Sequence, residues 1–344
     1  MYAPIGNLHR CLYGLLRVAL RCPEPEGLMD QLKALSDKDW RDILSLAREQ
    51  AVSGLVYEAL SMKDGMVNLP EDVSLDLMMD ASRIEYRSRY LQTMADSIIG
   101  ALQKKGLHPL IMKGPSAANM YPVPSLRVSG DIDLYLPTAE VQKAREWLAN
   151  SFRTESWAPD GSWHYNADGV EIDLHSHYFD LSVPERRLPQ VPSPEATLLM
   201  LSSHILKHAM GPGVGLRQIC DMVVASRALK GKFDPHMLRK YFRNTCVTRW
   251  NKMLVSMIRQ RFGVDPGFFP VEDKAFYTLE RIIFAGGNFG QHGSSRKRAL
   301  TRSPRARKID TAFRFVLRIP FSLYYAPKEY VRYFFALLKG NLAM

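Results

Sequence analysis

The chain has 344 residues, 46% hydrophobic and 24% charged, which is ordinary for a folded globular protein and unlike the composition of a disordered one. Its four cysteines (Cys11, Cys22, Cys220 and Cys246) form no CxxC pair, which argues against a disulfide framework or a zinc site and favours a cytoplasmic protein. No signal peptide is recognisable at the start, and no stretch reaches the roughly 20 apolar residues that a membrane-spanning helix needs.

The net charge of +11 is concentrated near the C-terminal end. Residues 291–344 contain twelve lysines and arginines against two acids, which accounts for +10, so the other 290 residues are nearly neutral. The basic excess is therefore a property of this tail and not of the whole surface.

Helical patterns occupy the first part of the chain. Ser36 followed by Asp39 is close to a capping box and predicts a helix start at this point. Apolar residues at helical spacing follow Trp40, and a longer helix is predicted over Val73–Leu102. We expect residues 1–104 to form a helical region that acts as a scaffold.

The pattern changes to short strands after this helical region. An apolar strand over His108–Lys113 leads into a turn at Gly114 and a brief helix. Asp168-Gly169 is typical of a hairpin turn. Further strands are predicted over 131–136, 152–157, 163–166 and 170–178, with a helix over 139–151. Residues 105–183 are thus expected to form a small mixed sheet.

The remainder of the chain is predicted to be helical. A proline-rich stretch from Pro184 to Pro194 indicates a linker, and helical patterns continue after it through a C-terminal region over 184–344. The predicted fold class is therefore α+β, with a small mixed β-sheet between N-terminal and C-terminal helical regions.

Three carboxylates on the predicted strands are the strongest functional signal. Asp131 and Asp133 are two residues apart and would project from the same face of one strand, while Asp173 is available from a neighbouring strand. Carboxylates that converge repel one another unless a cation lies between them. Oxygen ligands suit Mg²⁺, and two metal ions that clamp an in-line displacement at phosphorus commonly use such a site.

The residues around these carboxylates favour a catalytic interpretation. An isolated Gly-Asp-x-Asp motif is weak evidence for a catalytic site, because acidic residues are common at strand ends and turns. Here Lys113-Gly114 ends the preceding strand, where a glycine lets the backbone approach a phosphate. Arg127 precedes Asp131 by four residues and could hold a phosphate as a rigid fork.

Several motifs together resemble a known family. The chain resembles the poorly characterised bacterial nucleotidyltransferase family of the DNA polymerase beta-like superfamily. The resemblance covers residues 30–225, including Asp39-Trp40 on one side and His204, His208 and Gly215–Asp221 on the other. The motifs of its central part are Lys113-Gly114-Pro115-Ser116, Tyr121-Pro122-Val123-Pro124, Arg127, Gly130-Asp131-Ile132-Asp133-Leu134 and Glu171-Ile172-Asp173-Leu174-His175.

The resemblance implies metal-dependent transfer of an NMP from an NTP, with ATP as the expected donor. Asp131 and Asp133 would hold Mg²⁺ or Mn²⁺, and Asp173 would complete the site as a ligand or as a base. The superfamily usually has Gly-Ser or Gly-Gly on its phosphate-binding turn, so the Gly114-Pro115-Ser116 of this chain leaves the role of Ser116 open. The residues expected to bind the nucleotide are Lys113, Gly114, Ser116, Arg127 and Gly130.

The resemblance implies no particular acceptor. A hydroxyl on a small molecule, a protein or RNA would fit, and the oligomeric state is not indicated. Glu171 shares a strand face with Asp173, so either could be the third acid, and the Asp-Leu-His match favours Asp173. The alternative is a non-catalytic module that keeps this fold and binds a nucleotide or a partner; three intact carboxylates favour the enzyme.

The histidines offer a competing interpretation as a metal site. His175 and His177 are two apart on a strand, and His204 and His208 have i, i+4 spacing on a helix. The HExxH glutamate is absent, so we expect packing or substrate-facing histidines instead of a zinc site.

Four residues remain as candidates to line the acceptor pocket. These candidates are Glu171, His175, His208 and Arg217. Arg217 and Asp221 are i, i+4 on a predicted helix and could equally form an ordinary ion pair.

The basic tail supports two interpretations. The segment 296–308 has seven cations and no acid, and nine aromatic residues follow between Phe313 and Phe335. One interpretation is attachment to an anionic surface, either the inner leaflet of the cytoplasmic membrane or RNA. The other is a basic loop followed by helices whose aromatics pack on the C-terminal region, and we favour it because aromatic stripes at helical spacing are usually core.

Overall fold

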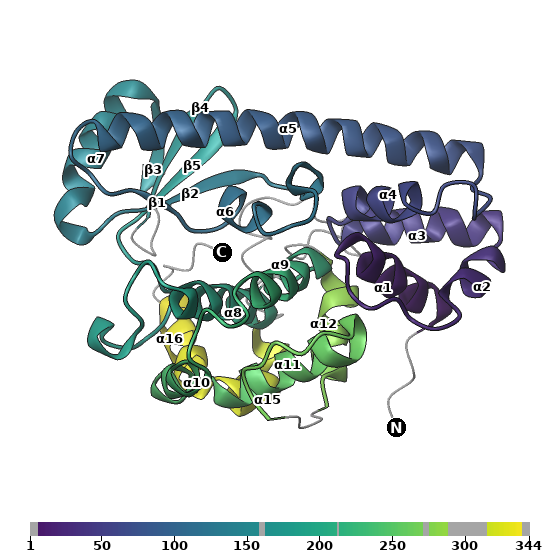
Figure 1. Ribbon diagram of the computed structural model, residues 1–344. Coiled ribbons are helices and arrows are strands. Elements are labelled where there is room, and N and C mark those ends of the chain that lie inside the picture. The colour runs from purple at the N-terminus through teal and green to yellow at the C-terminus, as the bar shows by residue number, and fades with distance from the viewer. Residues whose placement is uncertain (1–5, 158–161, 212, 271–274, 288–314, 339–344) are drawn as a thin grey trace.

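The N-terminal region is built from helices (Figure 1), and the two whose starts were predicted, after Ser36 and at Val73, begin within two residues of those positions. The computed structural model describes residues 6–157, 162–211, 213–270, 275–287 and 315–338. At the predicted capping box, the Ser36 hydroxyl accepts from the Asp39 N–H and the Asp39 carboxylate accepts from the Ser36 N–H at 3.0 Å. The helices are α1 (Asn7–Ala19), α2 (Leu28–Lys33), α3 (Asp37–Glu49), α4 (Ser53–Ser61) and α5 (Glu71–Gln103).

A small mixed sheet follows, which confirms the α+β fold class. Its strands have the order β1-β2-β5-β4-β3, and only the β2–β5 pair is parallel among the described strands. The first strand is shorter than predicted, and the last strand ends at His175. The strands are β1 (Leu110–Ile111), β2 (Asp131–Tyr135), β3 (Arg153–Trp157), β4 (Trp163–Ala167) and β5 (Val170–His175).

One face of this sheet is apolar and covered by helices. Ile132 and Ile172 lie on that face, in a buried cluster with side chains of α5 and of α7 (Thr138–Ser151). Figure 1 shows α5 running along this side of the sheet and continuing over α3 and α4. The strand alternation therefore leaves the acidic positions on the opposite face.

Two short helical segments connect the first two strands. They are α6 (Pro115–Ala118) and the 3₁₀ turn η1 (Pro124–Leu126). The first of them, α6, follows the Lys113-Gly114 turn directly, and this turn lies against the Asp131 end of β2.

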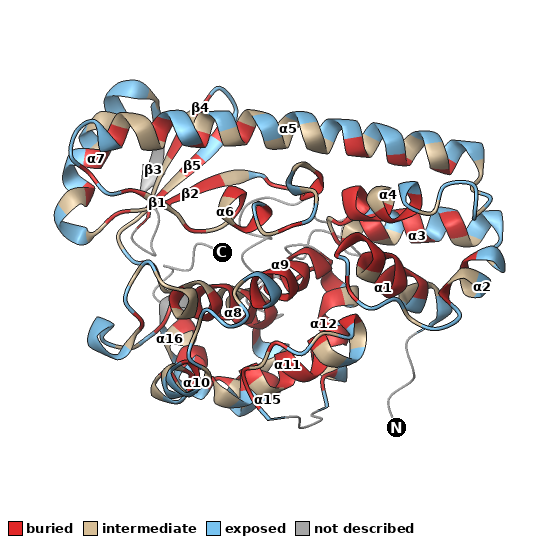
Figure 2. Cartoon of the chain, viewed as in Figure 1, coloured by how far each residue is buried: buried red, intermediate tan, exposed pale blue. Residues whose placement is uncertain are grey.

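The C-terminal region is helical and shares a core with the N-terminal helices. Buried apolar side chains from α1, α3 and α4 form one continuous cluster with those of the C-terminal helices (Figure 2). The chain thus returns to pack against its own beginning. The elements of this region are η2 (Glu185–Arg187), α8 (Pro194–Met210), α9 (Leu216–Ala228), α10 (Pro235–Asn244), α11 (Thr248–Phe262), α12 (Tyr277–Gly286), α15 (Ile319–Tyr325) and α16 (Pro327–Leu338).

Part of the aromatic stretch near the C-terminus packs into this core. Phe315, Phe321, Tyr330 and Tyr333 are buried, whereas Tyr324 and Phe335 belong to the exposed hydrophobic residues. The basic segment 296–308 lies outside the described residues. Among the described helices, none combines the length and the apolar character needed to cross a membrane.

Candidate active site

The candidate catalytic acids lie on the polar face of the sheet. Strands β2 and β5 run parallel with Asp131 opposite Glu171 and Asp133 opposite Asp173. Residues paired in this way on adjacent strands project from the same face. The sequence therefore gathers four carboxylates on two strands, while the residues between them point into the apolar core.

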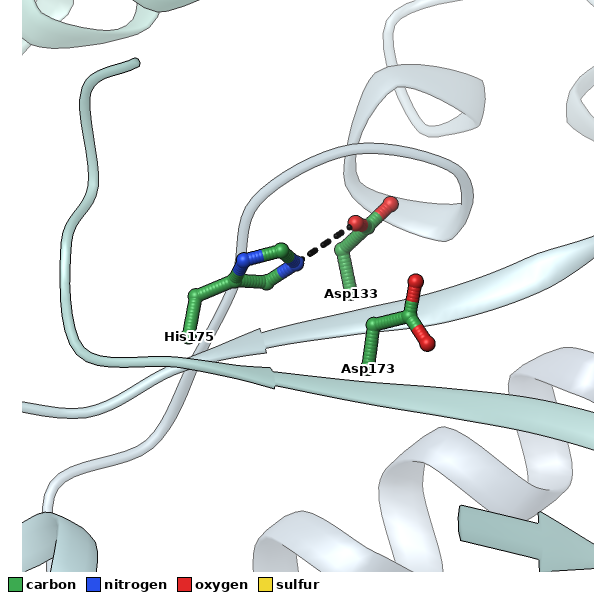
Figure 3. Close-up of side chains that lie close together, drawn as sticks. All are labelled: Asp133, Asp173 and His175. Carbon is green, nitrogen blue, oxygen red and sulfur yellow. Dashed lines mark hydrogen bonds and ion pairs between the residues drawn. The ribbon is translucent and has the colours of Figure 1, made fainter. Parts of the chain in front are cut away.

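Asp133, Asp173 and His175 form one compact group on this face. One ligand atom from each residue lies within 4.8 Å of the others, and His175 Nε2 is 3.0 Å from Asp133 Oδ1. Figure 3 shows both carboxylates rising on the same side of neighbouring strands, with the imidazole turned toward Asp133. Oxygen donors from two carboxylates fit a hard divalent cation, so the residues present are compatible with Mg²⁺.

Lys113 reaches the same group from the turn after β1. Its Nζ donates to Asp133 Oδ1 at 2.7 Å. Gly114 has φ +55°, and a Cβ there would lie 3.2 Å from the Asp131 carbonyl oxygen. A glycine is therefore required at this position both for the left-handed backbone and for the close approach of the turn to β2.

The two aspartates of β2 have opposite electrostatic environments. Burial raises the pKa of Asp131, and the charge of Asp133 adds to this effect. Burial would also raise the pKa of Asp133, but Lys113 and His175 outweigh it and hold that pKa well below its usual range. Asp131 lies outside the two groups of described residues whose ligand atoms are close enough to share one ion.

His164 of β4 belongs to the site, and sequence reasoning missed it. Its Nδ1 lies 2.6 Å from Asp173 Oδ1 and 3.1 Å from Glu171 Oε1. The contact with Asp173 raises the pKa of His164 to about 9, against the opposing effect of burial.

The hairpin turn carried the signal that could have identified His164. Asp168 and Gly169 have φ of +50° and +81°, so the predicted two-residue turn is present. Such a turn pairs Ala167 with Val170, and three steps back along β4 this register places His164 opposite Asp173.

Arg127, expected from the sequence to hold a phosphate, is instead buried and paired with a carboxylate. Its side chain is 4% exposed, and Nε and Nη2 donate to the two carboxylate oxygens of Asp221 at 2.8 and 2.7 Å. Nη1 donates to Ser129 Oγ at 2.7 Å. A buried guanidinium requires a paired charge, and a carboxylate of α9 supplies it.

Both carboxylate oxygens of Asp221 therefore accept hydrogen bonds from Arg127. Asp221 also accepts a hydrogen bond from the Tyr121 hydroxyl at 2.7 Å. The network ties the loop between α6 and β2 to the C-terminal helices. Sequence reasoning considered Asp221 only as a partner of Arg217, because i, i+4 spacing is visible in the sequence and a contact across 94 residues is not.

The other pocket candidates, His208 and Arg217, come from α8 and α9. Arg217 donates from Nη1 to the Val128 carbonyl oxygen at 2.8 Å. Its positive charge favours the ionised form of Asp131 and so lowers the pKa of that carboxyl, against the effect of burial. The rings of His204 and His208 meet edge to face at 4.4 Å. Burial lowers the pKa of His204 well below its usual value and that of His208 to about 3, so both are neutral near pH 7.

The remaining predicted residues lie at the margin of the site. Ser116 is on α6, directly after the turn at Gly114. Gly130 is exposed, and a Cβ there would meet open space. His177 is exposed, 3.9 Å from Glu185, and takes no part in either group of described metal-compatible side chains.

Comparisons with known proteins agree with this geometry. Residues 36–263 match the model of a protein family described as an uncharacterised nucleotidyltransferase. No curated protein and no solved structure matches the chain. The matched segment contains the sheet, the clustered carboxylates and the helices α3 to α11 that surround them.

Proposed function

The chain belongs to this uncharacterised nucleotidyltransferase family, and from that premise we propose that it moves an NMP from an NTP to a hydroxyl acceptor. The observation that carries the proposal is the in-register pair of Asp133 and Asp173 on parallel strands. Their carboxylates lie in one group with His175, compact enough to share an ion. This arrangement is the one expected where cations must be held beside a triphosphate.

Metal ions would be held by Asp133 and Asp173, with Asp131 as the adjoining acid on β2. A bound Mg²⁺ or Mn²⁺ would neutralise the charge that develops on the phosphate oxygens. The low pKa of Asp133 keeps this carboxylate ionised near neutral pH, which is the form that a metal requires.

Asp173 would take the proton of the acceptor hydroxyl. The acceptor oxygen forms a bond to the α-phosphorus as the bond from that phosphorus to the β-phosphate oxygen breaks. Pyrophosphate leaves with the electron pair of the broken bond, and the hydroxyl proton passes to the Asp173 carboxylate. Asp173 is partly exposed next to Asp133, so an acceptor can reach both the base and the phosphate.

Lys113 would position the triphosphate. An ammonium group has three N–H donors, so Lys113 can hold Asp133 and a phosphate oxygen at the same time. The Gly114 turn brings the backbone close to the same position, which supports phosphate binding there.

We place this activity in the cytoplasm, with ATP as donor. All four cysteines are free thiols, as expected in a reducing compartment. The body of the chain is nearly neutral, which favours a small-molecule or protein hydroxyl over a long nucleic acid as acceptor.

The test is isothermal titration with each of the four NTPs, with and without Mg²⁺. The wild type should bind one of them in a metal-dependent manner, and Asp133→Asn should weaken that binding by more than about tenfold. Asp168→Asn is the matched control, because it makes the same chemical change at the exposed hairpin turn.

Circular dichroism of each variant confirms that it is folded. If the wild type bound none of the four NTPs, the proposal would fail, and a non-catalytic partner-binding module would be the better description.

A further inference from the structure

A second group of metal-compatible side chains lies on the other side of Asp173. His164, Glu171 and Asp173 each offer one ligand atom within 4.8 Å of the other two. The group shares only Asp173 with the Asp133–His175 group; His164 comes from β4, and Glu171 from the start of β5 beside the hairpin turn. The proposed transfer reaction uses neither His164 nor Glu171.

The imidazole of His164 is held with Nδ1 toward the two carboxylates. Its Nε2 is 3.3 Å from the hydroxyl oxygen of Ser162, a buried residue at the start of the strand. Histidines that bind metals usually engage their second ring nitrogen in such a hydrogen bond, which fixes the ring and the tautomer. The β4–β5 register independently places the ring beside Asp173.

An ion pair alone leaves this arrangement incompletely satisfied. The two carboxylate oxygens lie 2.6 and 3.1 Å from the same Nδ1 atom. One N–H group has a single direction and cannot be well aligned with both oxygens. A metal ion in front of Nδ1 would bind the nitrogen and both oxygens at the same time.

We propose that His164, Glu171 and Asp173 bind a first-row transition-metal dication, such as Mn²⁺ or Zn²⁺, at a site distinct from the one that holds the NTP-bound metal. Imidazole nitrogen is a preferred ligand of these metals, whereas Mg²⁺ favours an all-oxygen environment. Two carboxylates match the charge of a dication. The side chain of Glu171 is 54% exposed, which gives the ion a path from solvent.

Because Asp173 belongs to both groups, a metal ion bound at one group affects the other. Asp173 would contribute one ligand to each ion, so an ion at His164 fixes the orientation in which this carboxylate faces the NTP-bound metal. Binding at this second site does not depend on nucleotidyl transfer and can be measured without any nucleotide.

The test is a titration of the nucleotide-free full chain with Mn²⁺, Zn²⁺ and Mg²⁺ by calorimetry, and with Co²⁺ by visible absorption. The wild type should bind the transition metals more tightly than Mg²⁺, and Co²⁺ should develop the absorption of a nitrogen-containing site. His164→Ala and Glu171→Gln should each weaken Zn²⁺ binding by about tenfold or more.

His108→Ala is the matched control. His108 is an exposed histidine whose Nδ1 lies 2.7 Å from a single carboxylate, Glu140, and its loss should leave the titration unchanged. Glu171→Gln should remain folded, because this side chain is at the surface, so a loss of Zn²⁺ binding in this variant cannot be attributed to misfolding.

Unchanged Zn²⁺ affinity in both site variants, or no transition-metal binding by the wild type, would overturn the proposal. Asp133→Asn separates it from the proposed function, since that variant should lose NTP binding and keep the Zn²⁺ site.

Discussion

Asp131 and Asp133 are two residues apart on one strand, yet the protein shifts their pKa values in opposite directions. The difference arises from partners that are distant in sequence: Lys113 and His175 both contact Asp133. Carboxylates whose pKa values are separated in this way can take different roles in one reaction. The charged form of Asp133 is therefore already stabilised before any metal arrives.

The Arg127–Asp221 pair should be essential for stability. Replacing Arg127 with Met leaves a buried carboxylate without its bidentate partner, and we expect a loss of about 3–5 kcal/mol in the free energy of unfolding. Urea unfolding measures this loss. The control is Arg41→Met, which breaks the Arg41–Asp72 pair, whose side chains are 51% and 57% exposed, and should cost less than about 1 kcal/mol.

The double variant Arg127→Met/Asp221→Leu should recover much of that loss, because the uncompensated buried charge is then gone. Equal losses for the buried and the exposed single variants would show that Arg127 has no such structural role.

His208 should make the protein less stable in mild acid. Burial, reinforced by Lys207 and Lys113, lowers its pKa to about 3, whereas the unfolded chain takes up the proton near pH 6.5. The unfolded state therefore binds more protons below pH 6.5. The free energy of unfolding should fall with decreasing pH in that range, by up to about 1.4 kcal/mol per pH unit for this residue.

Urea unfolding at pH 7.5 and 5.5 tests this expectation. His208→Gln should show a smaller loss than the wild type between these two conditions, while the exposed control His236→Gln should behave like the wild type. Parallel losses in all three proteins would contradict the effect of His208.

At the scale of elements, the β4–β5 hairpin determines which side chains meet. Both turn residues have positive φ, so the two-residue loop and the register of His164 with Asp173 depend on backbone conformations that L-residues avoid. The grouping of His164, Glu171 and Asp173 therefore depends on a turn that itself contributes no metal ligand.

Gly169→Val should weaken this element. A β-branched residue at φ +81° is strained, and we expect a loss of about 1–3 kcal/mol in the free energy of unfolding. Thermal unfolding monitored by circular dichroism measures it. Gly130→Ala is the matched control, since Gly130 has no positive φ and faces open space, and its stability should equal that of the wild type.

If the two glycine variants were equally stable, the turn would not constrain the hairpin as described.

The long helix α5 is the element that joins the sheet to the helical core. Its C-terminal half contributes Leu91 and Ile98 to the cluster beneath the sheet, and its first half contributes Val73 and Leu77 to the helical core. The Nη2 of Arg87, between these halves, donates to the Gly130 carbonyl oxygen at 3.0 Å. The helix therefore supports the loop before Asp131 as well as both cores.

For the molecule as a whole, the N-terminal and C-terminal helices behave as one packed unit. Gln50 is fully buried between them: its Nε2 donates to the Ile283 carbonyl oxygen at 3.1 Å, and its Oε1 accepts from the Leu216 N–H at 3.0 Å. One side chain thus satisfies backbone groups of α9 and α12 from the N-terminal part of the chain.

Gln50→Met should therefore destabilise the whole fold. It keeps the volume but removes the acceptor of the buried Leu216 N–H, at about 1–3 kcal/mol. The Ile283 carbonyl oxygen also loses the Gln50 amide but keeps its hydrogen bond from the Gly287 N–H. Urea unfolding followed by tryptophan fluorescence measures the effect. Gln103→Met, at the exposed end of α5, is the control and should change the free energy of unfolding by less than about 0.5 kcal/mol.

A loss in Gln50→Met no larger than in that control would argue against the bridge between the two ends of the chain.

The sequence by itself determined the fold class, the starts of α3 and α5, and the β4–β5 turn. These features depend on periodicity, turn residues and capping, all of which act over a few residues. The nearby spacing of Asp131 and Asp133 was enough to choose β2 as the strand of the candidate site.

Only the tertiary structure decided which partner each charged side chain of the site has. Arg127 looked free for a phosphate, but a carboxylate 94 residues away neutralises it, and His164 gained its place through strand register. Long-range contacts of buried charges follow from the need to pair each charge that leaves water, and local sequence does not identify the partner. The same requirement explains why Lys113 lies on Asp133. The core shared by the N-terminal and C-terminal helices follows instead from the removal of apolar side chains from water, which also joins segments distant in sequence.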